Sequence, residues 1–352
     1  MTTNFNGGPH SRRALRSIGL WGAPGSGKTT FLAALFIAVN RSNLDLRIYG
    51  VDDESTEFLV ESTDTLANEH RFPAATAQVK SLSWTMSMMT RMQVTERGRF
   101  GRQNSSTITV PAEFSIDLRD APGRVFGSQP AVSRSAGGSR LDIDGDEPTD
   151  TPNRLPVPVL SDDDMMDYLA GCDGVLLLID PVREQESGDA HQYFQGTLLR
   201  IAQRRLAAMP PGSRLPHHVA VCISKFDHPD VYQFARRSGY RTYAENDPFF
   251  PQVDDRDAER FFLDLCRRSE HSDAELVTNA LAQYFHRDRI RYFATSAIGF
   301  YLGQASRFRE GDPYNLMKQG DGTNKIRGQV HPINVLEPML WLGHRVAARN
   351  RP

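Results

Sequence analysis

The chain has 352 residues, which exceeds the usual length of a small single domain and predicts one enlarged domain or a domain with sizeable insertions. Its 41 basic and 43 acidic residues leave a formal charge of -2, so nothing in the composition indicates nucleic acid as a partner. The three cysteines lack metal or redox spacing, and the longest apolar run, residues 31–39, is too short to span a membrane. We therefore expect a cytoplasmic α/β protein without direct membrane insertion.

The first residues are rich in Gly, Asn and Thr, and residues 1–14 are predicted to be disordered. An apolar run at residues 18–21 then predicts a strand, and residues 29–39 predict a helix. Between them lies a complete G-x-x-x-x-G-K-[ST] phosphate loop. The residues predicted to bind phosphate are Gly22, Ala23, Pro24, Gly25, Ser26, Gly27, Lys28, Thr29 and Thr30.

This strand, loop and helix order is what phosphate binding requires. A glycine-rich turn lets consecutive backbone N–H groups point at phosphate oxygens, and the N-terminus of the following helix adds a partial positive charge. Lys28 is predicted to reach the β and γ phosphates, and the Thr29 hydroxyl to hold Mg²⁺. The sequence therefore predicts a nucleotide-binding site.

The next segments supply a second motif. Residues 44–50 predict a strand, residues 54–68 a short amphipathic helix, and the alternating residues 81–88 a half-buried strand. Residues 107–120 are expected to pair with that strand and to lead into a D-x-x-G motif, Asp120-Ala121-Pro122-Gly123. Asp120 is expected to hold Mg²⁺ through water, and the Gly123 N–H to meet the γ-phosphate.

Residues 174–179 are apolar on both faces and predict a central strand. Two further apolar strands follow in the chain, and each ends in a polar motif. Residues 219–223 lead into Ser224-Lys225-Phe226-Asp227, which is similar to the [NT]-K-x-D guanine motif. In that motif a carboxylate accepts hydrogen bonds from guanine N1–H and N2–H₂, which adenine cannot offer. Residues 291–294 lead into Thr295-Ser296-Ala297, similar to the S-A-K segment whose backbone N–H contacts guanine O6.

The order of these motifs, each at the carboxyl end of an apolar strand, resembles the Ras-like P-loop GTPases of the translation-factor-related class. The resemblance implies an α/β fold with a mostly parallel six-stranded sheet and helices on both faces. It also implies GTP or GDP as ligand, Mg²⁺ as cofactor, and a protein effector or activator. The resemblance covers about half the chain, namely the motif-bearing strands and their helices.

Several positions depart from the family pattern or leave alternatives open. Ser224 stands where the family has Asn or Thr, and Arg124 follows Gly123 where many members carry the Gln that orients the attacking water. The family's switch threonine would correspond to Thr76, although a solvent-facing turn threonine fits that position equally well. The expected catalytic residues are Lys28, Thr76, Gly123 and Arg124, and the expected magnesium ligands are Thr29, Thr76 and Asp120.

The remaining segments are predicted to be insertions in a single domain over residues 15–348. They lie at about 41–80, 124–161, 229–288 and 300–331, and the second is acidic and rich in Gly and Pro. Helices are predicted over residues 162–169, 192–209, 257–268, 273–285 and 332–348, and a polar loop precedes the last of them. Arg287 and Arg289, just before the last strand, are either internal arginine fingers or exposed helix-end arginines.

Three functions fit these motifs. The first is a GTPase that acts as a nucleotide-dependent switch with slow hydrolysis. The second is an interaction module that holds GTP or GDP without hydrolysing it, and the third is an ATPase, which would make residues 224–227 a coincidence. A narrower resemblance, to a bacterial GTPase group associated with multi-gene signalling or conflict systems, implies a regulator rather than a metabolic enzyme.

Overall fold

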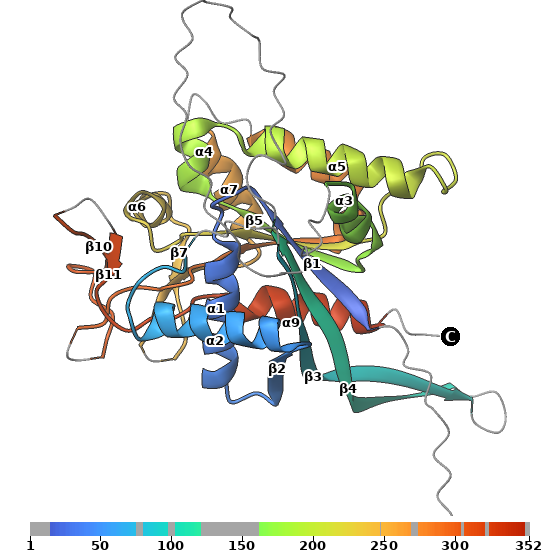
Figure 1. The fold of residues 1–352 in the computed structure, drawn as a ribbon, viewed down its shortest axis with the longest axis horizontal. Helices are drawn as coiled ribbons and strands as arrows, with labels where there is room; N and C mark the ends of the chain where they lie inside the picture. Colours follow the sequence, from blue (N-terminus) through green and yellow to red (C-terminus); the bar gives the residue numbers. More distant parts are fainter. Residues whose placement is uncertain are drawn as a thin grey trace, which may run out of the picture.

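The computed structural model describes residues 15–74, 80–97, 103–120, 162–246, 248–268, 274–303, 306–320 and 324–348. These ranges form a central sheet with helices on both faces (Figure 1). The predicted disordered segment 1–14 and the acidic insertion 124–161 lie outside the described residues.

The central sheet has the strand order β2-β3-β4-β1-β5-β6-β9. Neighbours from β4 to β9 pair in parallel, whereas β3 is antiparallel to both β4 and β2. The strands are β1 (Arg16–Gly22), β2 (Leu46–Gly50), β3 (Lys80–Arg97), β4 (Gln103–Asp120), β5 (Gly174–Ile179), β6 (His218–Ile223) and β9 (Ile290–Ala294). The predicted α/β class with a mostly parallel sheet is therefore confirmed, with seven strands instead of six because β2 adds an edge strand.

Helices and two small hairpins surround this sheet. The helices are α1 (Lys28–Arg41), α2 (Asp53–Ala67), α3 (Asp162–Gly171), α4 (Pro181–Ser187), α5 (Ala190–Leu206), α6 (Pro229–Arg237), α7 (Ala258–Cys266), α8 (Ala274–Tyr284), α9 (Leu336–Ala348) and the 3₁₀ helix η1 (Arg287–Arg289). The hairpins pair β7 (Arg241–Tyr243) with β8 (Pro251–Val253), and β10 (Leu316–Lys318) with β11 (Asn324–Ile326).

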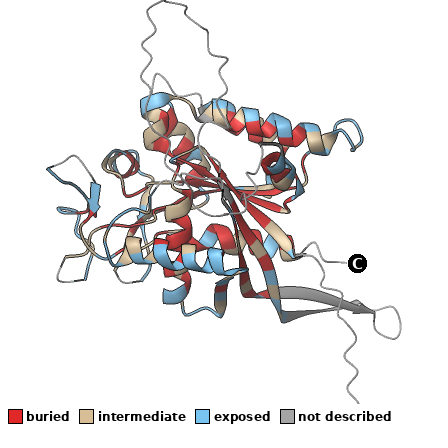
Figure 2. Cartoon of the chain, in the orientation of Figure 1, coloured by how far each residue is buried: buried red, intermediate tan, exposed pale blue. Residues whose placement is uncertain are grey.

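Two hydrophobic cores cover the two faces of the sheet. The side chains of α1, α2 and α9 form one core, and those of α3 and of α5 to α8 form the other (Figures 1 and 2). The alternation of β5 shows the division, because Leu176 and Leu178 belong to the first core and Val175, Leu177 and Ile179 to the second. All six residues of β5 are buried, as the apolar run predicts.

The long periodic helices agree with the sequence-based predictions, whereas the three-residue strands were not predicted. The sequence indicates α2, α5, α7 and α8 to within a few residues, but it indicates only a polar loop where the structure has the β10–β11 hairpin. Strands of three residues are too short to show a period, so composition dominates there. Within the described ranges, no helix combines the length and the apolar character needed to cross a bilayer.

Helix α9 packs tightly against the sheet at Gly343. A Cβ atom built there would lie 2.5 Å from a ring carbon of Phe114 and 2.7 Å from Met88 Sδ. Gly196 in α5 is a matched control, because it is exposed and a Cβ there would meet nothing within 4 Å.

We expect Gly343→Ala to lower the free energy of unfolding by about 1–3 kcal/mol, because overpacking outweighs the better helix propensity of alanine. Gly196→Ala is expected to raise it by about 0.5–1 kcal/mol. Urea titrations of both variants against wild type test the difference. Equal stabilisation by both would contradict the close approach of α9 to β3 and β4.

Candidate nucleotide-binding site

The predicted motifs converge at one edge of the sheet. β1 ends in the phosphate loop, β5 in Asp180, β6 in residues 224–227, and β9 in residues 295–297. These strands are neighbours and parallel, so their carboxyl ends share an edge, where ligands bind in open α/β sheets. The fold therefore brings the phosphate-type and guanine-type motifs together.

The phosphate loop has the backbone that its glycines predict. Gly25 and Gly27 adopt φ of 75° and 92°, in the left-handed region that favours glycine. Gly22 is needed for a close approach, because a Cβ there would lie 2.8 Å from the Leu178 carbonyl oxygen. Lys28 is buried, and its Nζ donates to the carbonyl oxygens of Gly22 at 3.1 Å and Ala23 at 3.4 Å.

Two features of the loop fit a bound phosphate group. Ser26 is 1% exposed, and its Oγ has no hydrogen-bond partner in the described part of the chain. Gly27 directly precedes α1, so the first N–H groups of this 14-residue helix face the same loop. An orphaned buried hydroxyl beside a helix N-terminus suits an anionic oxygen ligand.

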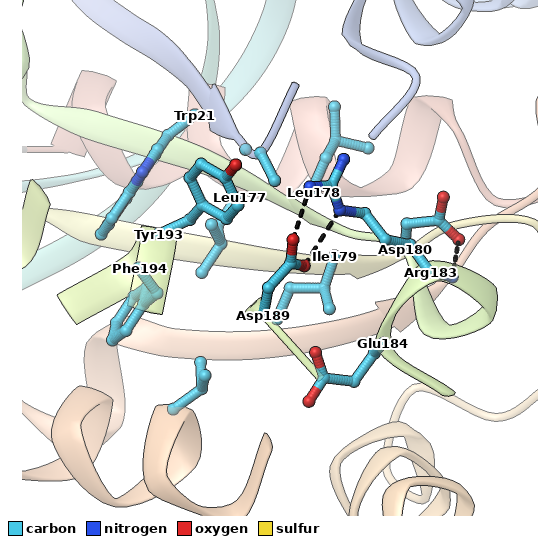
Figure 3. Close-up of a pocket in the computed structure, with 13 residues that line it drawn as sticks. Trp21, Leu177, Leu178, Ile179, Asp180, Arg183, Glu184, Asp189, Tyr193 and Phe194 are labelled. Carbon is cyan, nitrogen blue, oxygen red and sulfur yellow. Dashed lines mark hydrogen bonds and ion pairs between the residues drawn. The ribbon is translucent and has the colours of Figure 1, made fainter. Parts of the chain in front are cut away.

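The loop is fixed from one side by Arg183 of α4. Its Nη1 donates to the Pro24 carbonyl oxygen at 2.6 Å. Nε and Nη2 donate to the two carboxylate oxygens of Asp189 at 3.0 and 2.6 Å (Figure 3). The guanidinium also lies over the Tyr193 ring, 5.2 Å from its centroid. This bidentate, half-buried arrangement holds one conformation of the loop more firmly than an exposed ion pair would.

Asp180 connects the start of α4 to the loop after β6. Its carboxylate caps α4 by accepting from the backbone N–H groups of Val182 and Arg183 at 3.1 and 3.3 Å. The second oxygen lies 2.5 Å from Lys225 Nζ. Lys225 has φ of 57°, an unfavourable region for a non-glycine residue, and this pairing helps to hold it there.

The Asp227 carboxylate is buried with few partners. Its side chain accepts a hydrogen bond from Ser296 Oγ, and that hydroxyl in turn accepts from the Gly299 N–H at 2.8 Å. Burial raises the pKa of Asp227 to about 6, against opposing contributions from the Ser296 hydrogen bond, a hydrogen bond from the backbone of Asp227 itself and the charge of Lys225. Oδ1 of the carboxylate is thus engaged by Ser296.

The loops around Asp227 are tied into the sheet. The Ser224 N–H and Oγ both donate to the Ile179 carbonyl oxygen, at 2.9 and 3.1 Å. Ser296 was predicted to contact the ligand, but it is fully buried, and its N–H donates to the Ile333 carbonyl oxygen. The structure therefore gives Ser296 a supporting position behind Asp227, whereas Ala297 lines the cavity.

A cavity of about 520 Å³ joins these parts, a volume typical of small-molecule sites. Residues 25–27 and Thr30 line it from the phosphate loop and the start of α1. The loops after β6 and β9 contribute Ser224, Lys225, Asp227, Thr295 and Ala297. Residues that the sequence gave no reason to select also line it, namely Phe72, Val182, Glu186, His228, Ile298, Leu316, Lys318 and Asn324.

The other predicted site residues fall at or beyond the limits of the described ranges, apart from Thr29. Thr76, Gly123 and Arg124 are outside the described residues, and Asp120 ends β4 with its side chain not described. Thr29 is half-buried at the start of α1. No cluster of three His, Cys, Asp or Glu side chains suited to a metal occurs within the described ranges.

Arg287 and Arg289 are not arginine fingers of this site. Both lie in η1, before the amino end of β9, whereas the site lies at the carboxyl end of that strand. Arg289 Nη1 donates to the Pro216 carbonyl oxygen at 2.7 Å, and Arg287 is 79% exposed, 3.7 Å from Glu259. The helix-end alternative is the observed one. Arg183 was missed because its contact with Pro24 depends on the fold and on no spacing in the sequence.

No family model and no curated protein matches the chain. Among solved structures, it is similar to the signal recognition particle receptor SRb-GTP/SRX complex from Chaetomium thermophilum, with 13% identity over 84% of this chain and 95% of that chain, and a TM-score of 0.30. The chain is also similar to the GTP-bound Ski7 GTPase-like domain of S. cerevisiae, with 12% identity over 96% of this chain and 51% of that chain, and a TM-score of 0.35. For Sup35 complexed with GMPPNP, the identity is 13% over 81% of this chain and 38% of that chain, and the TM-score is 0.29. Because these TM-scores are below 0.5, what the protein binds is inferred from its own site.

The raised pKa of Asp227 predicts a pH dependence of stability in the nucleotide-free protein. The folded pKa of about 6 exceeds the ordinary aspartate pKa of 3.8, so the stabilisation by the neutral form is complete below pH 3.8 and is lost as pH rises through 6. Asp227→Asn keeps the acceptor for Ser296 and removes the charge. We expect the free energy of unfolding of this variant to gain on wild type by roughly 3 kcal/mol between pH 4 and 7.

Urea titrations at pH 4, 5, 6 and 7 test this expectation. Asp45→Asn is the control, because the Asp45 side chain is 68% exposed. Its stability should follow the wild-type pH profile. Parallel profiles for all three proteins would show that Asp227 is ionised at no cost in the folded protein.

Proposed function

We propose that the protein is a Ras-like P-loop GTPase of the translation-factor-related class, which binds GTP and GDP with Mg²⁺ and acts as a nucleotide-dependent switch. The observation that carries the proposal is the position of Asp227. Its buried carboxylate lines the same cavity as residues 25–27 of the phosphate loop. A phosphate cradle and a carboxylate acceptor in one cavity suit a guanine nucleotide.

The base preference follows from the hydrogen-bond donors of guanine. The Asp227 carboxylate would accept from guanine N1–H and N2–H₂, and Ser296 fixes its orientation. The Ala297 N–H is the candidate donor to guanine O6, because the Ser296 N–H is already used by Ile333. Adenine would leave the buried carboxylate unpaired, which argues against the ATPase alternative.

For the phosphates and the metal, we assign Lys28 to the β and γ oxygens and Thr29 to Mg²⁺. Asp120, Thr76 and Gly123 complete this assignment as second magnesium contact, switch threonine and γ-phosphate donor. Bound Mg²⁺ would neutralise phosphate charge during transfer of the γ-phosphoryl group to water. Arg124, in place of the family's glutamine, favours slow turnover and keeps a non-hydrolysing binding module as the second candidate.

The wider placement is also part of this proposal. We propose one domain over residues 15–348 with insertions near 41–80, 124–161, 229–288 and 300–331. A protein effector or activator would read the nucleotide state, as expected of a cytoplasmic regulator from the bacterial signalling or conflict group. Identification of the nucleotide that copurifies with the protein tests the ligand class directly.

The base assignment predicts a change of specificity. Wild type should prefer GTP over ATP by about 10²–10⁴-fold, because an unpaired buried charge costs roughly 3–5 kcal/mol. Asp227→Asn replaces an acceptor by an N–H₂ donor, so it should lose GTP affinity and gain affinity for xanthosine triphosphate, whose 2-position is a carbonyl. Calorimetric titration measures both.

Lys28→Ala is the control for this experiment, because it should lose GTP and xanthosine triphosphate alike while keeping the fold, as monitored by circular dichroism. Equal GTP binding by Asp227→Asn and wild type would make Asp227 a turn residue before His228-Pro229 and would favour the ATPase. A reversal from guanine to xanthine preference has no explanation in a turn residue.

The second prediction concerns the rate of hydrolysis. Charge-stabilising and water-orienting groups contribute about 10³–10⁵ to turnover in this reaction, so the isolated protein should hydrolyse GTP at well under about one per minute. Phosphate release under single-turnover conditions measures this, with Lys28→Ala as the control for contaminating activity. Faster turnover would mean that a group such as Arg124 already completes the site without a partner.

A further inference from the structure

One wall of the cavity comes from no predicted motif. It is formed by Leu316 and Lys318 of β10 and Asn324 of β11. In the antiparallel register, Leu316 pairs with Ile326 and Lys318 with Asn324, so these four side chains share one face of the hairpin. That face is turned to the cavity and the interior, whereas Met317 is 46% exposed on the other face.

The β10–β11 hairpin is anchored to the segment after β9, which lines the cavity. Asn315 is 1% exposed, and its Nδ2 donates to the carbonyl oxygens of Ile298 and Gln329, both at 3.1 Å. Its Oδ1 accepts from the Gly328 N–H at 2.9 Å. Ile298 directly follows Ala297, so the residue before β10 is hydrogen-bonded to the segment assigned to the base.

A second anchor comes from the segment after α2. The Ile326 N–H donates to the His70 carbonyl oxygen at 3.0 Å, and the Ile326 side chain is buried in the core of α1 and α2. Phe72, two residues beyond His70, lines the cavity as well. Two segments that are distant in sequence therefore line the cavity together.

Lys318 has a charge that the hairpin itself does not use. Lys28 donates to loop carbonyls and Lys225 pairs with Asp180, whereas the Lys318 ammonium has no ion pair or hydrogen bond among the described residues. A lysine ammonium offers three donors and no acceptor, which suits the ribose hydroxyls and α-phosphate oxygens of a nucleotide. Leu316, half-buried on the same face, offers apolar surface to the nucleoside.

We propose, on the basis of the function proposed above, that the β10–β11 hairpin is a third nucleotide-contacting element. Leu316 packs against the nucleoside, and Lys318 donates to ribose or α-phosphate oxygens. Because these groups are common to GDP and GTP, the hairpin slows release of both nucleotides equally and does not distinguish them.

The test measures dissociation of tritiated GDP and of a tritiated, slowly hydrolysed GTP analogue, both with an unmodified ribose. Lys318→Ala should raise the dissociation rate of each about ten-fold or more, as expected for a lost hydrogen bond to a charged group. Leu316→Ala should raise both rates as well. Lys325→Ala and Met317→Ala are matched controls on the opposite face of the same strands and should release nucleotide like wild type.

Different outcomes overturn different statements. If wild type retains guanine nucleotide and Lys318→Ala releases it no faster than Lys325→Ala, the hairpin proposal is wrong and the proposed function stands. Acceleration for the triphosphate analogue alone would also overturn the proposal, since it would place Lys318 at the γ-phosphate. A wild-type protein that binds no guanine nucleotide overturns the proposed function, and the hairpin proposal with it.

Discussion

The burial of the Asp227 carboxylate is the constraint on which the arrangement of residues 296–299 depends. A buried charge needs hydrogen bonds, and Ser296 supplies one, while the Gly299 N–H orients the Ser296 hydroxyl. Gly299 can occupy that place only as glycine, because its φ is 67° and a Cβ would lie 2.0 Å from the His331 carbonyl oxygen. A single carboxylate thus determines the geometry of the chain for several residues after β9.

The end of β5 joins the two halves of the site. Asp180 accepts the first N–H groups of α4 and pairs with Lys225, and three residues later Arg183 holds the Pro24 carbonyl. The start of one seven-residue helix therefore sets the distance between the phosphate loop and the Lys225 loop. Because Asp180 is buried, loss of the Lys225 ammonium or of the α4 N–H groups would leave its carboxylate as a desolvated charge.

The sequence predicted those parts of the fold that rest on local patterns. The period of residues 54–68, the apolar run of β5 and the glycines of the phosphate loop are local signals, and each corresponds to the observed element. Asp227 could be selected from its place after an apolar strand. Arg183, Phe72 and Lys318 could not be selected, because they belong to no motif and reach the site only when segments far apart in the chain pack together. Arg287 and Arg289 show the reverse case, since the topology puts them at the wrong end of β9.

The site combines a fixed part with a part from outside the sheet. The phosphate loop, Asp180 and Asp227 follow strands whose parallel ladders and two buried cores hold them in place. Phe72 and the face of β10 that carries Lys318 reach the same cavity from loops and a two-stranded hairpin, held by the His70 to Ile326 hydrogen bond and by Asn315. Two-stranded hairpins have little stability of their own, so these few hydrogen bonds and the buried Ile326 decide where that wall stands. Under the proposed function, the loops at the end of the sheet recognise phosphate and base, and the hairpin and the Phe72 segment retain the nucleotide.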